Sequence, residues 1–299
     1  MSTTYRRQEL EALVPHRGAN ILPDTLVVAP DGESSSSTVQ LGPDDERCIF
    51  GREDGAGGHS WLEPFLGEFM ALTGVPLLSG DLAAAGRVSV FSMVSRCSFS
   101  GDAPLHGTIE GRARITRRRG DFTQFACSVL HGDRELMTAE VMSGAAALAD
   151  IAAGTAQPLT EDTGEQVRPF LWKHPRLTFA DRITAMDVDA GTLTASYTYP
   201  VDHPFVPTHF PGAPLMMGVT QWAAVADAAW LLAERRQVDA ITVDGQITRP
   251  DGSDVIDVRG LQMQAGPGGV PRIRGSKRVA FRDVVRPNDG ILISVQAVG

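Results

Sequence analysis

The sequence is poor in the features that mark several classes of protein. Its only cysteines, Cys48, Cys97 and Cys127, are widely spaced and form no C-x-x-C pair. Neither a disulfide framework nor a structural zinc site is therefore expected. Basic residues are not in excess, because the net charge is −9. This charge argues against a nucleic-acid-binding protein, whose domains are usually basic.

Long apolar runs are also missing. No run approaches the roughly 18–20 residues needed to span a bilayer. The opening, "MSTTYRRQELEALVPHRG", has no apolar core of a signal peptide. These absences predict a cytoplasmic protein without a membrane partner. Neither the phosphate-binding pattern G-x-x-x-x-G-K nor the serine-hydrolase pattern G-x-S-x-G occurs, and no motif implies a cofactor or a metal.

The composition is that of a globular protein with two domains. The chain has 299 residues, of which 42% are hydrophobic and 21% charged, so it can bury a sizeable core. Residues 150–167, "DIAAGTAQPLTEDTGEQV", are small, polar and acidic, which predicts a linker. We therefore expect an N-terminal domain over 1–149 and a C-terminal domain over 168–299.

The two predicted domains repeat one pattern. Each has strand-like segments, then a turn-rich loop, then an apolar helix (64–74 and 218–236), then more strand-like segments. This order predicts an α+β fold in which one helix is wrapped by an antiparallel sheet. The second copy ends soon after "VVRPNDGILISV", whereas the first continues for two more strand-like segments. Either the second unit or the chain itself is then shortened.

One phrase points to a family. The segment "HFPGAPLMMGV" at 209–219 closely resembles the active-site segment of bacterial 3-hydroxyacyl-[acyl-carrier-protein] dehydratases. The phrases "VPHRGANILPD", "RVAFRDVVRPNDGILISV" and "GRARITRRRGDF" resemble other segments of that family. The resemblance implies hot-dog folds, and two copies in one chain imply a double hot-dog that forms an intrachain pseudo-dimer. A further homodimer is compatible with it.

The resemblance also implies one composite active site. The family's catalytic histidine matches His209, and its acid lies 14 positions later, where this chain has Ala223. Aligning the two halves without gaps places Asp54 opposite His209 and Glu68 opposite Ala223. Because family dimers build each site from both protomers, His209 and Glu68 would form one whole site. The site with Asp54 and Ala223 would be inactive.

Further roles follow from the same resemblance. Gly218 matches the glycine whose backbone N–H contacts the thioester carbonyl, at a helix N-terminus that offers free N–H groups. Met217 departs from the family, which usually has proline there, and this weakens the match. The residues expected to line the substrate tunnel are Phe210, Pro211, Gly212 and Gln221.

The implied reaction is dehydration of a 3-hydroxyacyl thioester to a trans-2-enoyl thioester, in fatty-acid or polyketide-type synthesis. Removing the C2 proton needs a base such as the imidazole of His209. Expelling hydroxide from C3 needs a protonated acid. Glu68 lies among the apolar side chains of "PFLGEFMALTG", a setting that favours the neutral form of a carboxyl group.

Three alternatives remain open. The enzyme could also isomerise the enoyl product, although Glu rather than Asp as the acid favours simple dehydration. It could instead be a hot-dog thioesterase in which Glu68 activates water, or a non-catalytic acyl-binding subunit. The substrate would be carried by an acyl carrier protein or by coenzyme A. Arg117–Arg119 could meet an acidic carrier protein, or could be a solvated strand end.

The other histidines are assigned structural roles. His16, His174 and His203 are expected to hydrogen-bond loops, and His59 in "GAGGHSW" has no assigned role. Asp54 is expected to be solvated or to cap its loop.

Overall fold

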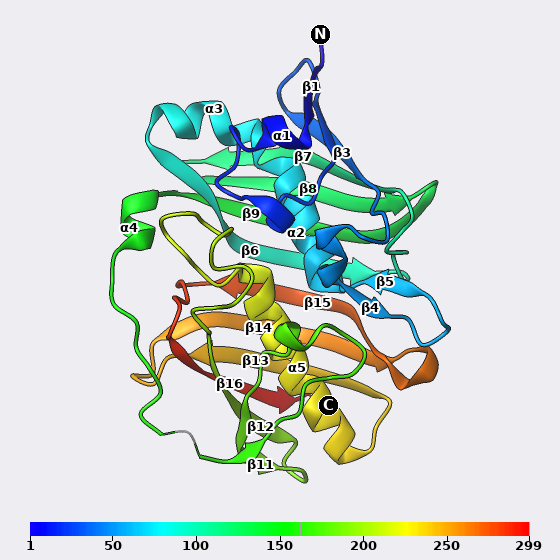
Figure 1. Cartoon of the computed structure of the whole chain (residues 1–299), viewed down its shortest axis with the longest axis vertical. Coiled ribbons are helices and arrows are strands. Elements are labelled where there is room, and N and C mark those ends of the chain that lie inside the picture. Colours follow the sequence, from blue (N-terminus) through cyan, green and yellow to red (C-terminus); the bar gives the residue numbers. More distant parts are fainter. Residues whose placement is uncertain (162, 299) are drawn as a thin grey trace.

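The computed structural model describes residues 1–161 and 163–298. Asp162, inside the predicted linker, and Gly299, the end of the predicted C-terminal domain, lie outside the described residues. The described chain forms one 14-stranded sheet, a two-stranded ribbon and a few helices. The predicted α+β class is confirmed (Figure 1).

The N-terminal half contains most of the helices. Its strands are β1 (Thr3–Arg6), β2 (Thr25–Val28), β3 (Ser34–Val39), β4 (Gly51–Glu53), β5 (His59–Trp61), β6 (Arg87–Phe99), β7 (Ile109–Arg119), β8 (Phe122–His131) and β9 (Arg134–Ala147). Its helices are α1 (Arg7–Leu10), α2 (Glu63–Gly74) and α3 (Pro76–Ala84), and α4 (Leu148–Ala152) follows β9.

The C-terminal half has one long helix, α5 (Gly218–Arg236). Its strands are β10 (Glu165–Gln166), β11 (Arg182–Asp187), β12 (Thr192–Thr198), β13 (Ala240–Thr248), β14 (Asp254–Ala265), β15 (Pro271–Phe281) and β16 (Gly290–Ala297).

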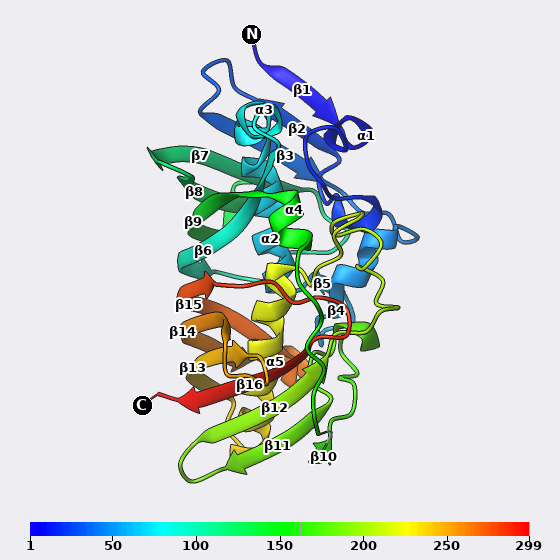
Figure 2. The same ribbon diagram turned by 90° about the vertical axis from the view of Figure 1, so that its left-hand side faces the viewer.

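The two halves share the sheet. β6 pairs with β15 in antiparallel register, with Val94 opposite Val279. The sheet lies on one side of the molecule, and α2 and α5 pack on one of its faces (Figure 2). The two helices approach closely at Gly67, where an added Cβ would lie 3.5 Å from the ring of Trp222.

The strands of the two halves occupy equivalent positions in the sheet, although they follow one another in a different order along the chain. From the outer edge inward, the N-terminal half runs β1-β2-β3-β7-β8-β9-β6, and the C-terminal half runs β10-β11-β12-β16-β13-β14-β15. In the N-terminal half, β8 and β9 follow β6 and β7 along the chain. In the C-terminal half the equivalent strands, β13 and β14, precede β15 and β16. Among the described residues, the second half has an equivalent for each strand of the first half's share of the sheet. The two strand-like segments expected after β16 come earlier in the chain.

The central helices are buried on nearly all sides. In α2, only Ala71 is not fully buried, and α5 is buried from Val219 to Ala233. Both helices were predicted from the sequence within one residue of their ends. α3 was not predicted, because Pro76 interrupts the apolar pattern and begins a new helix at its first position. No helix of the described chain is long and apolar enough to cross a membrane.

Candidate active site

A cavity of about 110 Å³ lies between α2, the sheet and the turn that precedes α5. Its wall combines side chains from both halves. From the N-terminal half come His16, residues of α2 and residues of β6, β8 and β9. From the C-terminal half come His209, the start of α5 and residues around Phe281. The predicted pair, His209 and Glu68, therefore lines one cavity.

Glu68 is the acidic group that α2 contributes to this cavity. It lies in the second turn of α2 and is only 3% exposed. Its apolar neighbours on the helix, Phe65, Leu66 and Phe69, are also buried. The ion-pair partner that the described residues provide for its carboxylate is His16, whose Nε2 lies 3.3 Å from Oε1.

His209 lies in a tight turn before α5 and is 8% exposed. Its Nδ1 lies 3.3 Å from the carbonyl oxygen of Leu215, and its backbone N–H donates to Phe205. Burial, together with the nearby charge of His16, lowers the pKa of His209 to about 3. The imidazole is therefore neutral at physiological pH and can accept a proton at the nitrogen that does not face Leu215.

His16 is the residue that sequence reasoning missed. It was expected to be structural, but the structure places it in the cavity wall, 5% exposed. Its ring centroid lies 4.9 Å from that of His209 and 5.1 Å from that of Phe210. A ligand atom from each of His16, Glu68 and His209 lies within 4.8 Å of the other two. The phrase "VPHRGANILPD" carried the family resemblance, but nothing in its spacing linked His16 to residues far along the chain.

These three side chains could hold a metal ion. Two imidazole nitrogens and a carboxylate are donors that suit a transition metal such as zinc. They form the one such group found among the described residues. The reaction proposed for this site uses only the side chains of the protein.

The N-terminus of α5 opens into the same cavity. Gly218 is the first residue of the helix and lines the cavity. An added Cβ there would lie 3.1 Å from the ring of Phe281, so a larger residue would require that ring to shift. Met217, at the N-cap, provides no side-chain cap, so the first N–H groups of the helix are not satisfied by it. Gln221 also lines the cavity, and its Oε1 has no hydrogen-bond partner among the described residues.

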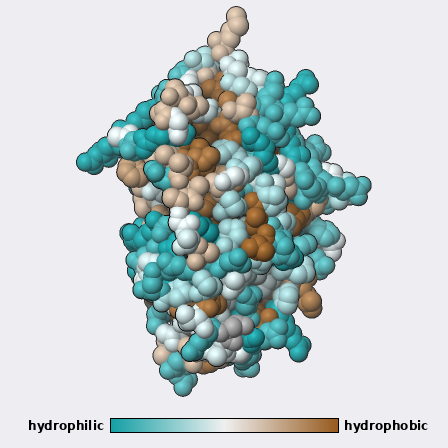
Figure 3. All heavy atoms as spheres, turned by 60° about the vertical axis from the view of Figure 1, so that its left-hand side comes forward, coloured by the Kyte–Doolittle hydropathy of each residue, from teal (hydrophilic) through white to brown (hydrophobic). Residues whose placement is uncertain are grey.

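The remaining wall is mostly apolar, but only part of the predicted tunnel belongs to it. Phe210 lines the cavity and is 4% exposed. Pro211 and Gly212 do not, because the turn points them outward and both are exposed. Phe210 and Leu215, which both line the cavity, also pack against Ile151 of α4. Apolar side chains gather on the half of the surface that includes α3 and α4 (Figure 3).

A second, smaller cavity of about 30 Å³ lies beside α5. Two buried ion pairs line it. Arg52 donates to both carboxylate oxygens of Glu63, the first residue of α2, and Lys173 pairs with Asp227 on α5. Burial lowers the pKa of Lys173 and raises that of Asp227, and each group partly offsets the shift of the other. Each of these two acidic side chains therefore has a basic partner in the cavity.

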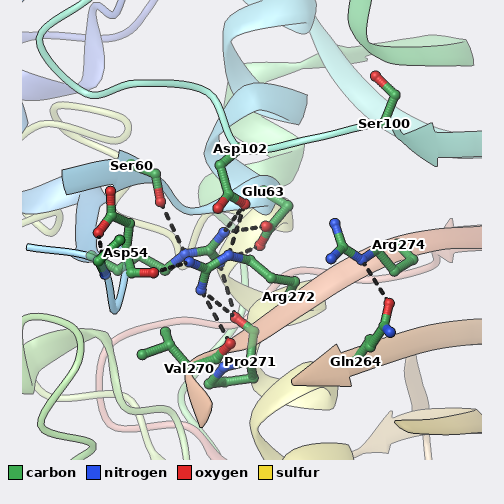
Figure 4. Close-up of polar contacts among 12 residues, drawn as sticks. Asp54, Ser60, Glu63, Ser100, Asp102, Gln264, Val270, Pro271, Arg272 and Arg274 are labelled. Atoms are coloured by element: carbon green, nitrogen blue, oxygen red, sulfur yellow. Dashed lines mark hydrogen bonds and ion pairs between the residues drawn. The ribbon is translucent and has the colours of Figure 1, made fainter. Parts of the chain in front are cut away.

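The Arg52 pair belongs to a wider network (Figure 4). Arg272 donates to Asp102 and to the backbone carbonyl of Asp54. The Asp54 carboxylate accepts from the backbone N–H groups of Ala56 and Gly58, and these bonds lower the pKa of Asp54. Asp54 is thus a loop cap, as expected.

The structure preserves the predicted register of the two helices. Glu68 and Ala223 both lie five residues after the first residue of their helices, Glu63 and Gly218. Ala223 lines the smaller cavity, so no carboxylate occupies the position equivalent to Glu68.

Two other histidines are structural, as expected. His203 lies 2.9 Å from the carbonyl oxygen of Arg176, and His174 accepts from the backbone N–H of Arg176. His59 is exposed. Arg118, in the basic run at the end of β7, pairs with Glu33 at 3.1 Å.

Comparisons with known proteins find relatives of the dehydratase type. Residues 172–260 match the FabA-like domain family. A 3-hydroxyacyl-[acyl-carrier-protein] dehydratase, FabZ of Chlamydia pneumoniae, is 38% identical over 52 residues, which cover 17% of this chain. The match spans about a third of that relative, 34% of its length.

Solved structures with similar folds include a dehydratase and a thioesterase. The dehydratase heterocomplex ApeI:P from Xenorhabdus doucetiae has 11% identity and a TM-score of 0.41, and the match covers 48% of this chain and 97% of that one. A mutant of the fluoroacetyl-CoA-specific thioesterase FlK has 15% identity and a TM-score of 0.29, covering 30% of this chain and 66% of that one.

The chain is a hot-dog protein, with an antiparallel sheet packed against long buried helices. More closely, its residues 172–260 are similar to the FabA-like domain family, and a stretch of 52 residues is similar to a 3-hydroxyacyl-[acyl-carrier-protein] dehydratase.

Proposed function

We propose that the chain dehydrates a 3-hydroxyacyl thioester at one composite site made of His209 and Glu68. The observation that carries the proposal is that these two side chains, 141 positions apart in the sequence, line one largely apolar cavity. In this proposal the two halves act as a double hot-dog, an intrachain pseudo-dimer over 1–149 and 168–299. One of its two equivalent cavities keeps the reactive groups.

In the proposed reaction the acyl chain enters the apolar cavity and its thioester carbonyl faces the N-terminus of α5. The free N–H groups there, at Gly218 and its neighbours, would stabilise the negative charge that develops on the carbonyl oxygen. His209 is neutral because its pKa is lowered to about 3, so it is ready to take the C2 proton. Its low pKa makes it a weak base in the empty cavity. The developing enolate charge offsets that penalty by stabilising the imidazolium.

Glu68 would supply the second proton transfer. The C3–O bond breaks as the carboxyl proton passes to the leaving hydroxyl, which departs as water. The C2–H electrons form the new double bond, so the atoms and charges balance. The reaction leaves a proton on His209 and a carboxylate at Glu68, and moving that proton back restores the starting state. General acid–base groups of this kind typically contribute about 10²–10⁴-fold each.

The substrate carrier is part of the proposal. The similarity to an acyl-carrier-protein dehydratase supports a carrier-protein or coenzyme A thioester in fatty-acid or polyketide-type synthesis. Arg117–Arg119, an exposed basic run, suits an acidic carrier protein.

The test is an assay with a 3-hydroxyacyl thioester on carrier protein and on coenzyme A, read by mass spectrometry. Loss of one water is expected with the wild type and with Asp54→Asn, the matched control in the other half. His209→Ala and Glu68→Gln should each reduce the rate at least about 100-fold. Free acid as the main product would instead indicate a thioesterase. Binding without turnover by the wild type would indicate an acyl-binding subunit.

A further inference from the structure

The turn that carries His209 is held by hydrogen bonds from the other half of the chain. Thr208, the residue before His209, accepts two of them. Its Oγ1 accepts from Nδ2 of Asn20 at 2.8 Å, and its carbonyl oxygen accepts from the backbone N–H of Arg17 at 3.0 Å. Asn20 is buried and lies 188 positions before Thr208. The contact therefore joins the N-terminal half to the start of the predicted catalytic turn.

These bonds reach His209 through one carbonyl group. The hydroxyl of Thr208 donates to the carbonyl oxygen of Phe205, which lies 3.3 Å away. The same oxygen accepts from the backbone N–H of His209 at 2.9 Å. A hydroxyl that accepts from Asn20 keeps its own proton for Phe205, so the bonds form one directed chain. The backbone at His209 is thus tied to a donor from the other half.

Asn20 is itself held in place. It is the last residue of a short 3₁₀-helix, η1 (Gly18–Asn20). Arg7 donates to the carbonyl oxygens of Gly18 and Ile21, at 2.7 Å and 3.2 Å. Gly18 has a left-handed backbone with φ of 55°, and an added Cβ would lie 3.3 Å from Cγ2 of Thr208. The segment is therefore packed closely against the turn, as a residue that positions another must be.

The equivalent place in the other half lacks this contact. The 3₁₀-helix η3 (Pro175–Leu177) corresponds to η1, and it ends on Leu177 where η1 ends on Asn20. The gapless alignment of the halves places Glu53 opposite Thr208. Leu177 is buried and has no polar side-chain atom, and Glu53 is exposed. The side-chain bond therefore accompanies the turn with the histidine and is replaced by an apolar residue in the half without it.

We propose that Asn20 is a positioning residue: its amide holds Thr208, and the turn thereby keeps the imidazole of His209 in the cavity that it shares with Glu68. This inference rests on the proposed function for its kinetic meaning, whereas the hydrogen bond does not. The described side chains that line the cavity do not include Asn20, so it acts through Thr208 and not on the substrate. A misplacement of about 1 Å in a reacting group can reduce a rate about 100-fold.

Three variants and a matched control test the contact. Asn20→Leu supplies the residue of the equivalent position, Thr208→Val removes the hydroxyl, and Thr208→Ser keeps it. We expect kcat to fall at least about 10-fold in Asn20→Leu and Thr208→Val and less than about 3-fold in Thr208→Ser. KM should change less than about 3-fold in all of them. Leu177→Met, the control in the other half, should keep kcat within about 2-fold.

A double-mutant cycle on kcat shows whether the two side chains act together. Asn20→Leu/Thr208→Val should lose no more than about 2-fold beyond the slower single variant, because each change breaks the same bond. Losses that multiply, or a Thr208→Ser variant as slow as Thr208→Val, would overturn the proposal. A KM that rises as much as kcat falls would also overturn it.

Hydrogen exchange separates this inference from the proposed function, because it needs no activity. In Asn20→Leu the backbone N–H of His209 should exchange at least about 10-fold faster, while the amides of α5 keep their wild-type rates. Thr208→Val gives the same measurement if Asn20→Leu does not fold. This result with an inactive wild type would refute the proposed reaction and keep the positioning role. Unchanged exchange at His209, or faster exchange throughout α5 as well, would overturn that role whatever the activity.

Discussion

Two cavities of the described chain, one beside α2 and one beside α5, lie at equivalent places in its two halves, yet their charged groups are paired differently. Beside α5, each acid has a basic partner: Arg52 binds Glu63, and Lys173 binds Asp227. Beside α2, Glu68 faces two imidazoles, and the pKa of His209 is lowered to about 3. Buried charges that are paired stabilise one protonation state. Glu68 has an imidazole rather than a lysine or an arginine as its partner, and imidazoles donate and accept protons near neutral pH, which is what the proposed chemistry requires.

The comparison also explains how one cavity would lose its reaction. The α5 cavity lacks a carboxylate at Ala223, and Asp54 caps a loop instead of facing inward. Glu63 takes the first position of α2, where the other helix has Gly218. At the start of α2, the carboxylate of Glu63 forms an ion pair with Arg52. It would repel the negative charge that develops on a thioester carbonyl oxygen. The same architecture thus holds a reactive cavity and a structural one.

The largest expected effect is on stability. Arg52→Met leaves Glu63 buried and unpaired, which should lower the free energy of unfolding by about 3–5 kcal/mol. Glu68→Gln in the other cavity should change it by less than about 1 kcal/mol, because no strong ion pair is lost. Urea denaturation of both variants measures the difference. Similar losses in the two would mean that the cavities do not differ in their charge pairing.

Lys173 and Asp227 should behave as a coupled pair. Lys173→Met alone should cost about 3 kcal/mol, since it leaves Asp227 buried with the N–H of Phe179 as its one remaining donor among the described residues. The double variant Lys173→Met/Asp227→Leu should recover at least about 1 kcal/mol of that loss. Additive losses in the double-mutant cycle would contradict the pairing.

His209 should make stability depend on pH. Its pKa is about 3 in the folded chain and about 6.5 for an unperturbed histidine, so unfolding takes up a proton between these values. Stability should therefore fall as the pH is lowered from about 6.5 toward 3, by about 2 kcal/mol between pH 6.5 and 5. His209→Gln should remove this part of the slope, and His59→Gln, at an exposed site, should not. Unfolding curves at pH 7, 6 and 5 measure it, and an unchanged slope in His209→Gln would contradict the shift.

The smallest expected effect is on activity at the second cavity. Ala223→Glu adds the missing acid to α5, but none of the described residues that line this cavity is a histidine. The rate of dehydration should stay within about 2-fold of the wild type, and the change should restore no activity to His209→Ala. A rate gained in that background would show that the second cavity is competent.

Local pattern predicted the elements well. The apolar segments at 64–74 and 218–236 became α2 and α5, and the strand-like segments expected before each helix include β3 and β12. The repeat was also visible. The order of the strands in the sheet was not visible. The pairs β8–β9 and β13–β14 are equivalent only because of their neighbours in the sheet, which the periodicity of a local segment does not reveal.

The site was predictable where the two halves could be aligned and not elsewhere. His209 and Glu68 followed from the register of one half against the other. His16 did not, since its meaning depends on Glu68, 52 positions away, and on His209, 193 positions away. Pro211 and Gly212 belong to the same phrase as His209, but a turn sends them to the surface. The ion pairs of the second cavity bring together residues from four segments, which only tertiary structure reveals.

The most direct test of the account is photo-crosslinking with a non-reactive 3-hydroxyacyl thioether analogue that bears a diazirine on its acyl chain. The account predicts a single label per chain, on peptides that line the α2 cavity, such as those with Met70, Val75 or Phe125. Labelling of peptides with Trp172, Trp230 or Met263, which line the α5 cavity, or two labels per chain, would contradict a single composite site.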